Sequence, residues 1–328
     1  MMETIDFLKR DIGQSEIVTF AQDKVNLKQD RFDVYREKVS DLQKHLERYV
    51  EEHPDMGLVK MFLSGSLKKH TALKTINDVD VALYVKGADL PSDLGPLLEW
   101  LADRLRTTYH QMPEANINVD GPCVVITFTG LGVDIEVAPV QYNDDPDWKG
   151  YLWDRSTGER ILTSIPQHIG FLKKRRVANK KHFVQVVRLL KWWARERSQD
   201  DEPLKIRSFL IELILAKIAD RGESFEDYQK SIEVFFQYVQ TSKLKERISF
   251  SDFYPASDLP TSSIGIVEIF DPVNAENNVA SDITEATRKL FIKRADEALD
   301  ALAFARTCTT KGEALECWQE LMGSSFNA

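Results

Sequence analysis

The chain has 328 residues, of which 43% are hydrophobic and 29% charged, the composition of an ordinary soluble globular protein with about two domains. A formal net charge of −9 and a sequence pI of about 5.3 exclude a chain-wide electrostatic attraction to nucleic acid, but not a local basic patch. The three cysteines are far apart and have no clustered histidines beside them, which argues against a disulfide framework and a zinc site.

The amino terminus and the hydropathy pattern bear on location. Residues 1–14 place acids among the apolar residues and lack an apolar core of signal-peptide length. No stretch approaches the ~18 apolar residues of a membrane span. We therefore expect a reduced, cytoplasmic protein with no membrane contact.

The first clear helix is predicted over residues 28–52. Its apolar side chains recur at spacings of three and four, with charged residues on the other face, and His53-Pro54-Asp55 ends the pattern. A stripe of this kind is typical of core packing. We interpret the helix as a brace against a sheet.

Residues 62–84 are predicted to form a strand, a phosphate-binding turn and a second strand. The apolar run stops at Ser64-Gly65-Ser66, where the backbone can turn tightly and offer N–H groups and hydroxyls to an anion. Asp78 and Asp80 follow at i and i+2 of the second strand, so both carboxylates point to one face. Close carboxylates repel unless a cation lies between them, and Mg²⁺ takes carboxylate and phosphate oxygens. A surface hairpin with solvated aspartates is the alternative, but the turn and the lysines after it favour a catalytic site.

Beyond the motif, a second amphipathic helix is predicted over residues 91–110, and strands over 117–119 and 123–129. The next strand, within 130–140, alternates strongly, so Asp134 and Glu136 share a face. A third carboxylate on a strand beside Asp78 and Asp80 is what a site for two metal ions needs.

The second half of the chain is predicted to be helical. Turn residues in 142–166 mark the passage to it, and 253–278 reads as a long loop. Asp282 with Glu285 has the pattern of a capping box at the start of the last predicted helix. The predicted helices are 168–178, 182–197, 206–219, 225–239 and 281–306.

Lys191 and Ser208 are candidates for contacts with a triphosphate. Lys191 lies on an otherwise apolar helix face and can reach a phosphate as a point charge, or it extends its charge to solvent along that face. Ser208 opens an apolar helix, where it can bind phosphate or act as an N-cap.

The dense basic run Lys173-Lys174-Arg175-Arg176, with Lys180-Lys181-His182 after it, is exceptional in this acidic chain. Such runs are usually solvated faces, but this density also suits a nucleic-acid backbone or the phosphates of a substrate. Both interpretations stay open from the sequence.

Taken together, these motifs resemble a known family. Gly65-Ser66, Asp78-Val79-Asp80 and a strand acid before Val-Ala-Pro resemble the polymerase β-type nucleotidyltransferase core. VVRLLKWWARE, IRSFLIELILAK and FDPVNAENNVA resemble the oligoadenylate synthase and cyclic GMP–AMP synthase group. Over nearly its full length, the chain is most similar to the bacterial CD-NTases of clade C, found in CBASS antiphage operons.

The resemblance implies an α+β fold in which a mixed sheet, flanked by helices and a long N-terminal brace helix, forms the nucleotidyltransferase core. It implies a core over 1–165, a helical lobe over 166–328, and an active site in the cleft between them. For the site it implies Asp78, Asp80 and Glu136 as catalytic metal ligands, with Asp134 as the alternative third ligand. The implied nucleotide contacts are Gly65, Ser66, Lys69, Lys191, Ser208, Asp271 and Asn278.

The implied reaction joins ATP into a cyclic oligonucleotide, cyclic tri-adenylate in this clade, with two Mg²⁺ (or Mn²⁺) ions and release of pyrophosphate. The implied partners are a HORMA-domain protein, an AAA+ ATPase regulator, an effector nuclease that senses the product, and double-stranded DNA through Lys173–Arg176. A linear 2′–5′ oligoadenylate synthase, a template-independent polymerase and an inactive nucleotide-binding scaffold are the alternatives.

Two positions depart from the family pattern. Lys69 is followed by His70, where the oligoadenylate synthases have glycine, so the family's lysine contact carries over less directly. The third acid is a glutamate, Glu136, where relatives usually have aspartate.

Overall fold

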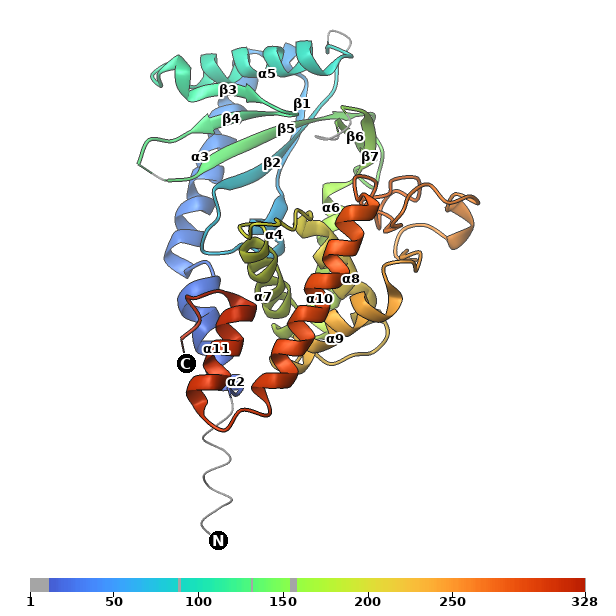
Figure 1. Cartoon of the computed structure of the whole chain (residues 1–328). Coiled ribbons are helices and arrows are strands. Elements are labelled where there is room, and N and C mark those ends of the chain that lie inside the picture. Colours follow the sequence, from blue (N-terminus) through green and yellow to red (C-terminus); the bar gives the residue numbers. More distant parts are fainter. Residues whose placement is uncertain (1–11, 88–89, 131, 154–157, 328) are drawn as a thin grey trace. The chain divides into compact units, whose positions relative to one another are not determined.

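The computed structural model describes residues 12–87, 90–130, 132–153 and 158–327, and the chain divides into two compact units (Figure 1). The sheet unit is Leu27–Phe171, and the helical unit combines Met1–Asn26 with Leu172–Ala328. Residues 1–11, which were considered for a leader, lie outside the described ranges. No helix within those ranges is long and apolar enough to cross a membrane.

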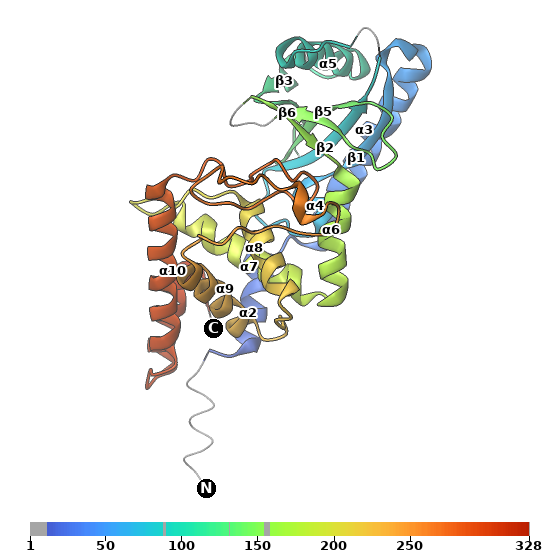
Figure 2. The same cartoon turned by 90° about the vertical axis from the view of Figure 1, so that its right-hand side faces the viewer.

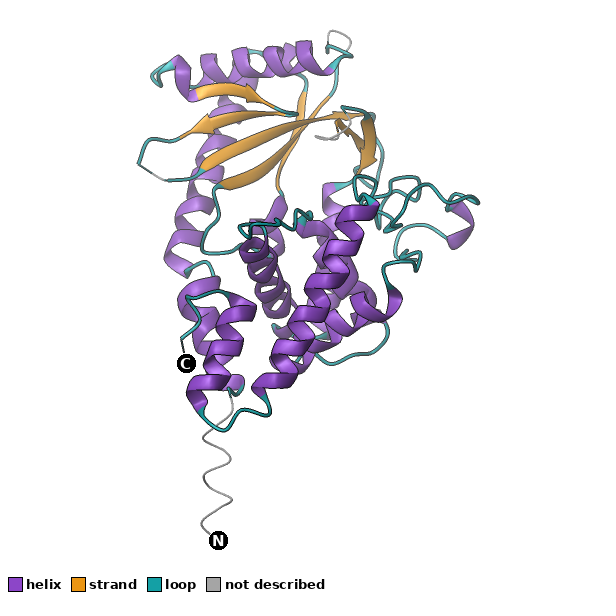
Figure 3. Ribbon diagram, in the orientation of Figure 1, coloured by secondary structure: helices purple, strands orange, loops and turns teal. Residues whose placement is uncertain are grey.

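The sheet unit is built on one mixed sheet of strand order β1-β2-β5-β4-β3, with β6 paired to the end of β5 and β7 paired to β6 (Figure 3). Strands β2 and β5 run parallel, and the other described pairs are antiparallel. This confirms the predicted mixed sheet, and adds β6 and β7, which were not predicted. The strands are β1 (Leu58–Leu63), β2 (Asp78–Val85), β3 (Ile117–Asp120), β4 (Cys123–Thr127), β5 (Asp134–Tyr142), β6 (Gly150–Trp153) and β7 (Arg160–Thr163).

Two long helices of this unit, α3 (Gln29–Glu52) and α5 (Leu94–Thr108), pack against one face of the sheet. The apolar stripe of α3 is buried there with alternate residues of β2, among them Val79 and Val81, so the predicted brace helix is confirmed. A short helix, α4 (Gly65–Lys69), follows β1. Two 3₁₀ turns complete the unit, η2 (Pro54–Met56) and η3 (Glu114–Asn116).

The helical unit confirms each of the five predicted helices, four of them with shifted ends, and adds α2 and α11. Trp192 and Trp193 lie in its core, where Trp192 Nε1 donates to the Met322 carbonyl at 2.8 Å. The described elements are α2 (Gln14–Phe20), a π-helical turn η1 (Ala21–Val25), α6 (Ile165–Ala178), which begins within the sheet unit, α7 (His182–Arg197), α8 (Ser208–Asp220), α9 (Tyr228–Ser242), a 3₁₀ turn η4 (Ala256–Asp258), α10 (Glu285–Ala305) and α11 (Lys311–Met322).

The start of α10 differs from the prediction. The N-cap is Thr284, whose side-chain oxygen accepts a hydrogen bond from the Thr287 N–H. Asp282 forms an ion pair with Arg207 at 3.0 Å. The capping box predicted from Asp282 and Glu285 is therefore wrong, because a partner distant in sequence engages the aspartate.

Candidate active site

The turn after β1 brings the backbone against an acidic side chain of β2. Ser64 is extended, and its N–H donates to the Asp80 carbonyl at 2.8 Å. Gly65 then adopts a φ of +56°, in the left-handed region that favours glycine. A Cβ at Gly65 would lie 1.6 Å from Asp80 Oδ2. The Asp80 carboxylate therefore lies directly against the turn that was predicted to bind phosphate.

This contact predicts a large effect for Gly65→Ala. The methyl group would displace the Asp80 carboxylate, and the left-handed φ would cost an alanine about 1–3 kcal/mol. We expect loss of nucleotidyl transfer together with a lower melting temperature. Gly132→Ala is the matched control, since Gly132 has a φ of +67° but no atom within 4 Å of the place that a methyl group would take. If Gly65→Ala lowers the melting temperature no more than Gly132→Ala and keeps full activity, the close approach of Gly65 to Asp80 is not needed for function.

The acidic residues of β2 and β5 share one face of the sheet. Val79 and Val81 point into the core with α3 and α5, so Asp78 and Asp80, both half-buried, point to the opposite face. The parallel register pairs Asp78 with Asp134 and Asp80 with Glu136. Four acidic positions therefore form two adjacent rows on this face.

The donor chemistry of these rows suits Mg²⁺, which takes carboxylate oxygens. Among the described residues, however, no three or more His, Cys, Asp or Glu side chains gather closely enough to hold a metal ion. The backbone positions thus fit a metal site, while the side-chain conformations are not those of a metal-bound state. The register brings Asp80 and Glu136 side by side on adjacent strands, where a metal ligand pair would need them.

Further along β2, the same face is aromatic. Tyr84 is fully buried beside Phe62 and Trp148. Its hydroxyl donates to the Trp148 carbonyl at 3.0 Å and accepts from the Ile165 N–H at 3.1 Å. Burial raises the pKa of Tyr84 to about 12, so the hydroxyl keeps its proton. This residue, which was not predicted, fixes the strand that carries the two aspartates to the start of α6.

Lys69 is the last residue of α4, and His70 after it adopts a φ of +61°. The His70 ring stacks on Phe32 of α3, with centroids 5.6 Å apart. A residue other than glycine is thus accommodated here at the cost of a left-handed backbone. The predicted contact of Lys69 with nucleotide stays a prediction.

In the helical unit, Lys191 is buried on α7, and its Nζ lies 3.7 Å from Glu212 Oε1 on α8. The ammonium group thus lies in the interior of the unit and does not extend to solvent. Ser208 is the first residue of α8 and is exposed, while Arg207 holds the N-cap position. The predicted N-cap role of Ser208 is therefore wrong, and phosphate binding by either residue stays a prediction.

Asp271 and Asn278 lie in the long connection between α9 and α10, coloured orange in Figure 2. Both are buried and bonded to the backbone of this loop. Asp271 Oδ1 accepts from the Val273 N–H at 2.8 Å. Asn278 Oδ1 accepts from Ile269 and Ala280 N–H groups, and its Nδ2 donates to the Val267 carbonyl. The geometry gives them a structural role in the loop, and their predicted nucleotide contacts stay predictions.

The basic run on α6 is not uniform. Arg175 is 4% exposed and pairs with Asp220 and Asp252, and its guanidinium lies over the Phe250 ring. Burial acts to raise the pKa of Asp252, but the hydrogen bonds from Arg175 and Lys174 outweigh it and lower that pKa below its usual range. Lys173 and Lys174 are exposed and Arg176 is half-buried. Arg175 therefore joins α6 to the end of α8 and to the loop at Asp252, and it is too buried to contact a polyanion.

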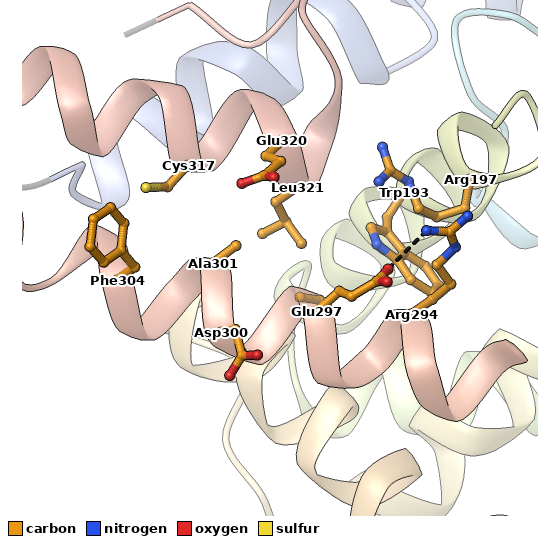
Figure 4. A pocket seen from close by; sticks show the side chains of 11 residues that line it. Trp193, Arg197, Arg294, Glu297, Asp300, Ala301, Phe304, Cys317, Glu320 and Leu321 are labelled. Carbon is orange, nitrogen blue, oxygen red and sulfur yellow. Dashed lines mark hydrogen bonds and ion pairs between the residues drawn. The ribbon is translucent and has the colours of Figure 1, made fainter. Parts of the chain in front are cut away.

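A cavity of about 680 Å³ lies in the helical unit between α10 and α11, beside Trp193 (Figure 4). Its wall includes the ion pair of Arg294 with Glu297 at 2.9 Å and the exposed ring of Phe304. None of the predicted site residues lines it. The cavity therefore shares no lining residue with the acidic face that is our candidate active site.

Known proteins are similar to this chain in sequence and in fold. Residues 13–175 match the Second Messenger Oligonucleotide or Dinucleotide Synthetase domain (SMODS). The chain is 44% identical, over 96% of its length and 98% of the relative, to a cyclic AMP-AMP-AMP synthase of Escherichia coli strain MS 115-1. It is 30% identical to a CBASS oligonucleotide cyclase CdnC of E. coli strain KTE188, over 96% of this chain and 98% of that relative.

A solved structure has the same architecture. The structure of E. coli MS115-1 CdnC with ATP superposes with a TM-score of 0.93 at 43% identity, covering 97% of this chain and 99% of that one. A more distant structure, the Vibrio cholerae DncV cyclic AMP-GMP synthase at 15% identity, shares the fold with a TM-score of 0.59. Fold, domain match and identity over the full length agree, and the chain belongs to the bacterial CD-NTases, the nucleotidyltransferases that synthesise cyclic oligonucleotides.

Proposed function

We propose that this protein joins ATP into cyclic tri-adenylate for CBASS antiphage signalling in the cytoplasm. One observation carries the proposal: the full-length similarity to a cyclic AMP-AMP-AMP synthase, in a chain whose acidic residues share one sheet face beside the turn at Gly65. The likeness to a structure solved with ATP supports ATP as the substrate.

In the mechanism that we propose, the triphosphate of ATP binds at the Gly65-Ser66 turn, next to the Asp80 carboxylate. Asp78, Asp80 and Glu136 would hold two Mg²⁺ ions. When bound, the ions supply Lewis acidity toward the acceptor hydroxyl, the α-phosphate and the departing pyrophosphate. The three carboxylates would keep the positive charge of the ions on one face of the sheet, and the turn would orient the phosphates.

Each transfer forms a bond between a ribose hydroxyl oxygen and the α-phosphorus of the next ATP, and breaks the bond from that phosphorus to the β-phosphate oxygen. The hydroxyl proton passes to solvent, and pyrophosphate leaves. Two intermolecular transfers give a linear trimer. A third transfer, by the trimer's own terminal hydroxyl on its triphosphate end, closes the ring.

The test is incubation of the protein with each NTP and Mg²⁺, followed by phosphatase and nuclease treatment and mass spectrometry. The expected product from ATP is a cyclic trimer of AMP that resists phosphatase, because it has no terminal phosphate. Linear products that lose phosphates would support an oligoadenylate synthase or a polymerase instead. Binding of ATP without any product would support a scaffold.

We also propose a HORMA-domain protein as a partner, together with an AAA+ ATPase regulator and an effector nuclease that senses the product. The first of these rests on a relative, since E. coli MS115-1 CdnC has been solved as a complex named CdnC:HORMA-deltaN, which superposes on this chain with a TM-score of 0.92. Co-purification of the co-expressed proteins tests the association directly.

Double-stranded DNA is a further proposed ligand, with Lys173, Lys174 and Arg176 as its contacts. Replacing these three by alanine is expected to weaken DNA binding and to flatten its salt dependence, by about 0.9 in the slope of log K against log salt for each lost phosphate contact. Fluorescence anisotropy at several salt concentrations measures both. If DNA affinity and its salt dependence are both unchanged, these basic residues form a solvated face and do not bind DNA.

Arg175→Ala is the counterpart of that triple variant. Arg175 is buried, and its removal leaves the nearly buried Asp252 short of its partner. We therefore expect a loss of about 3 kcal/mol in the free energy of unfolding, whereas the exposed lysines contribute little to stability. Equal stability of Arg175→Ala and wild type would contradict the structural role.

A further inference from the structure

A buried thiol lies beside the proposed third metal ligand. Cys123, the first residue of β4, is 3% exposed. Its Sγ lies 3.6 Å from Glu136 Oε2 and 3.1 Å from the Asp120 carbonyl oxygen. The thiol has a single hydrogen, a weak donor for which these two acceptors compete, and Glu136 is the carboxylate of the two.

The sheet register explains why these side chains meet. Glu136 of β5 is paired with Asp80 on one side and with Val125 of β4 on the other. Val124 and Ile126 point into the core with α3 and α5, so Cys123, on the alternate face, points to the acidic side of the sheet. Glu136 thus has a carboxylate neighbour on β2 and a thiol neighbour on β4.

Glu136 also needs a restraint more than its neighbours do. A glutamate has one more rotatable bond than Asp78 or Asp80, and its terminal torsion is broad and loosely defined. A donor on one carboxylate oxygen limits that torsion and so orients the group toward a metal. The Cys123 thiol lies 3.6 Å from Oε2 and supplies such a donor when its hydrogen turns from the Asp120 carbonyl to the carboxylate.

We propose that Cys123 is a positioning residue for this site: its thiol orients the Glu136 carboxylate, and it acts on metal binding only through Glu136. The inference rests on the proposed function, because it takes Glu136 as a metal ligand. Cys123 itself touches neither substrate nor metal in this assignment.

The first test compares Cys123→Ala, which removes the donor, with Cys123→Ser, which keeps one. Binding of Mn²⁺ alone is followed by the loss of the free-ion EPR signal, and product formation is measured in parallel. Because loss of an outer partner of a metal ligand typically costs about 10–100-fold, and the thiol is a weak donor, we expect Mn²⁺ affinity to fall by about tenfold in Cys123→Ala. Cys123→Ser should recover most of that loss.

Cys317→Ala is the matched control. Cys317 is also buried, and its thiol donates to a backbone carbonyl, that of Glu313, within α11. Its removal deletes a buried thiol of the helical unit, whereas the acidic face belongs to the sheet unit. Mn²⁺ binding and turnover should stay at the wild-type level, and a loss equal to that of Cys123→Ala would overturn the proposal.

A double-variant cycle separates positioning from packing. In a Glu136→Gln background, Cys123→Ala should cause no further loss of Mn²⁺ affinity, since the residue acts through the carboxylate. An equal loss in both backgrounds, or a serine variant as weak as the alanine variant, would assign Cys123 to packing and overturn the proposal. Wild-type Mn²⁺ affinity in Cys123→Ala would overturn it as well, while the proposed function would fail only if the wild-type protein made no nucleotide product.

Discussion

Replacing either Asp78 or Asp80 by asparagine is expected to abolish measurable product while the fold persists. Each change removes a charge from a site proposed to hold two cations. The charge stabilisation that metals supply in such transition states is worth several kcal/mol, and ~1.4 kcal/mol corresponds to a tenfold change in rate. We therefore expect turnover to fall by roughly a thousandfold or more, measured as pyrophosphate release from ATP.

We also expect a direction for the change in melting temperature of these variants. Without metal, asparagine relieves the repulsion between the neighbouring carboxylates, so the melting temperature should stay equal or rise. Added Mg²⁺ should then stabilise the variants less than the wild type. Asp144→Asn is the control, because Asp144 is an exposed residue of the same unit in a surface ion pair with Lys86. Wild-type turnover in Asp78→Asn or Asp80→Asn would exclude the two-metal assignment.

The second large effect is expected at Glu136 rather than Asp134. The register pairs Asp134 with Asp78 and Glu136 with Asp80, so both acids share the face and alternation cannot choose between them. We favour Glu136 because Gly65 lies against the carboxylate of Asp80, which is paired with Glu136 in the strand register. Two residues displace a carboxylate by about 6–7 Å, at ~3.3 Å per residue, which places Asp134 at the level of Asp78 and not at the level of Asp80.

We accordingly expect Glu136→Gln to lose activity by roughly the same factor as the aspartate variants, and Asp134→Asn to keep a substantial part of it. Steady-state rates at saturating ATP, with Mg²⁺ varied, measure both. The reverse order of the two variants would move the third ligand to Asp134.

Local patterns predicted much of this fold. The helix over His182–Arg197 was predicted to the residue, because its apolar spacing is regular and buried faces follow the same period. The shared face of Asp78 and Asp80 follows from the alternation of a strand. Strands β6 and β7 escaped prediction because both lie within 142–166, where the turn residues were read as a passage between the two halves of the chain.

What sequence could not predict depends on partners distant in the chain. The pairing of Lys191 with Glu212 joins two helices, and that of Asp282 with Arg207 spans 75 positions. The Cys123–Glu136 contact depends on the register of β4 against β5. A period identifies which face a side chain occupies, but only tertiary packing decides what it meets there.

The parallel pairing of β2 and β5 has a consequence for folding during synthesis on the ribosome. Parallel neighbours need a crossover, and here it runs through α5, β3 and β4. A ribosome therefore releases Asp78 and Asp80 long before Glu136, and this non-local pairing can close only after the crossover has emerged. A nascent chain in which β2 has been synthesised but β5 has not carries only the Asp78 and Asp80 part of the acidic face.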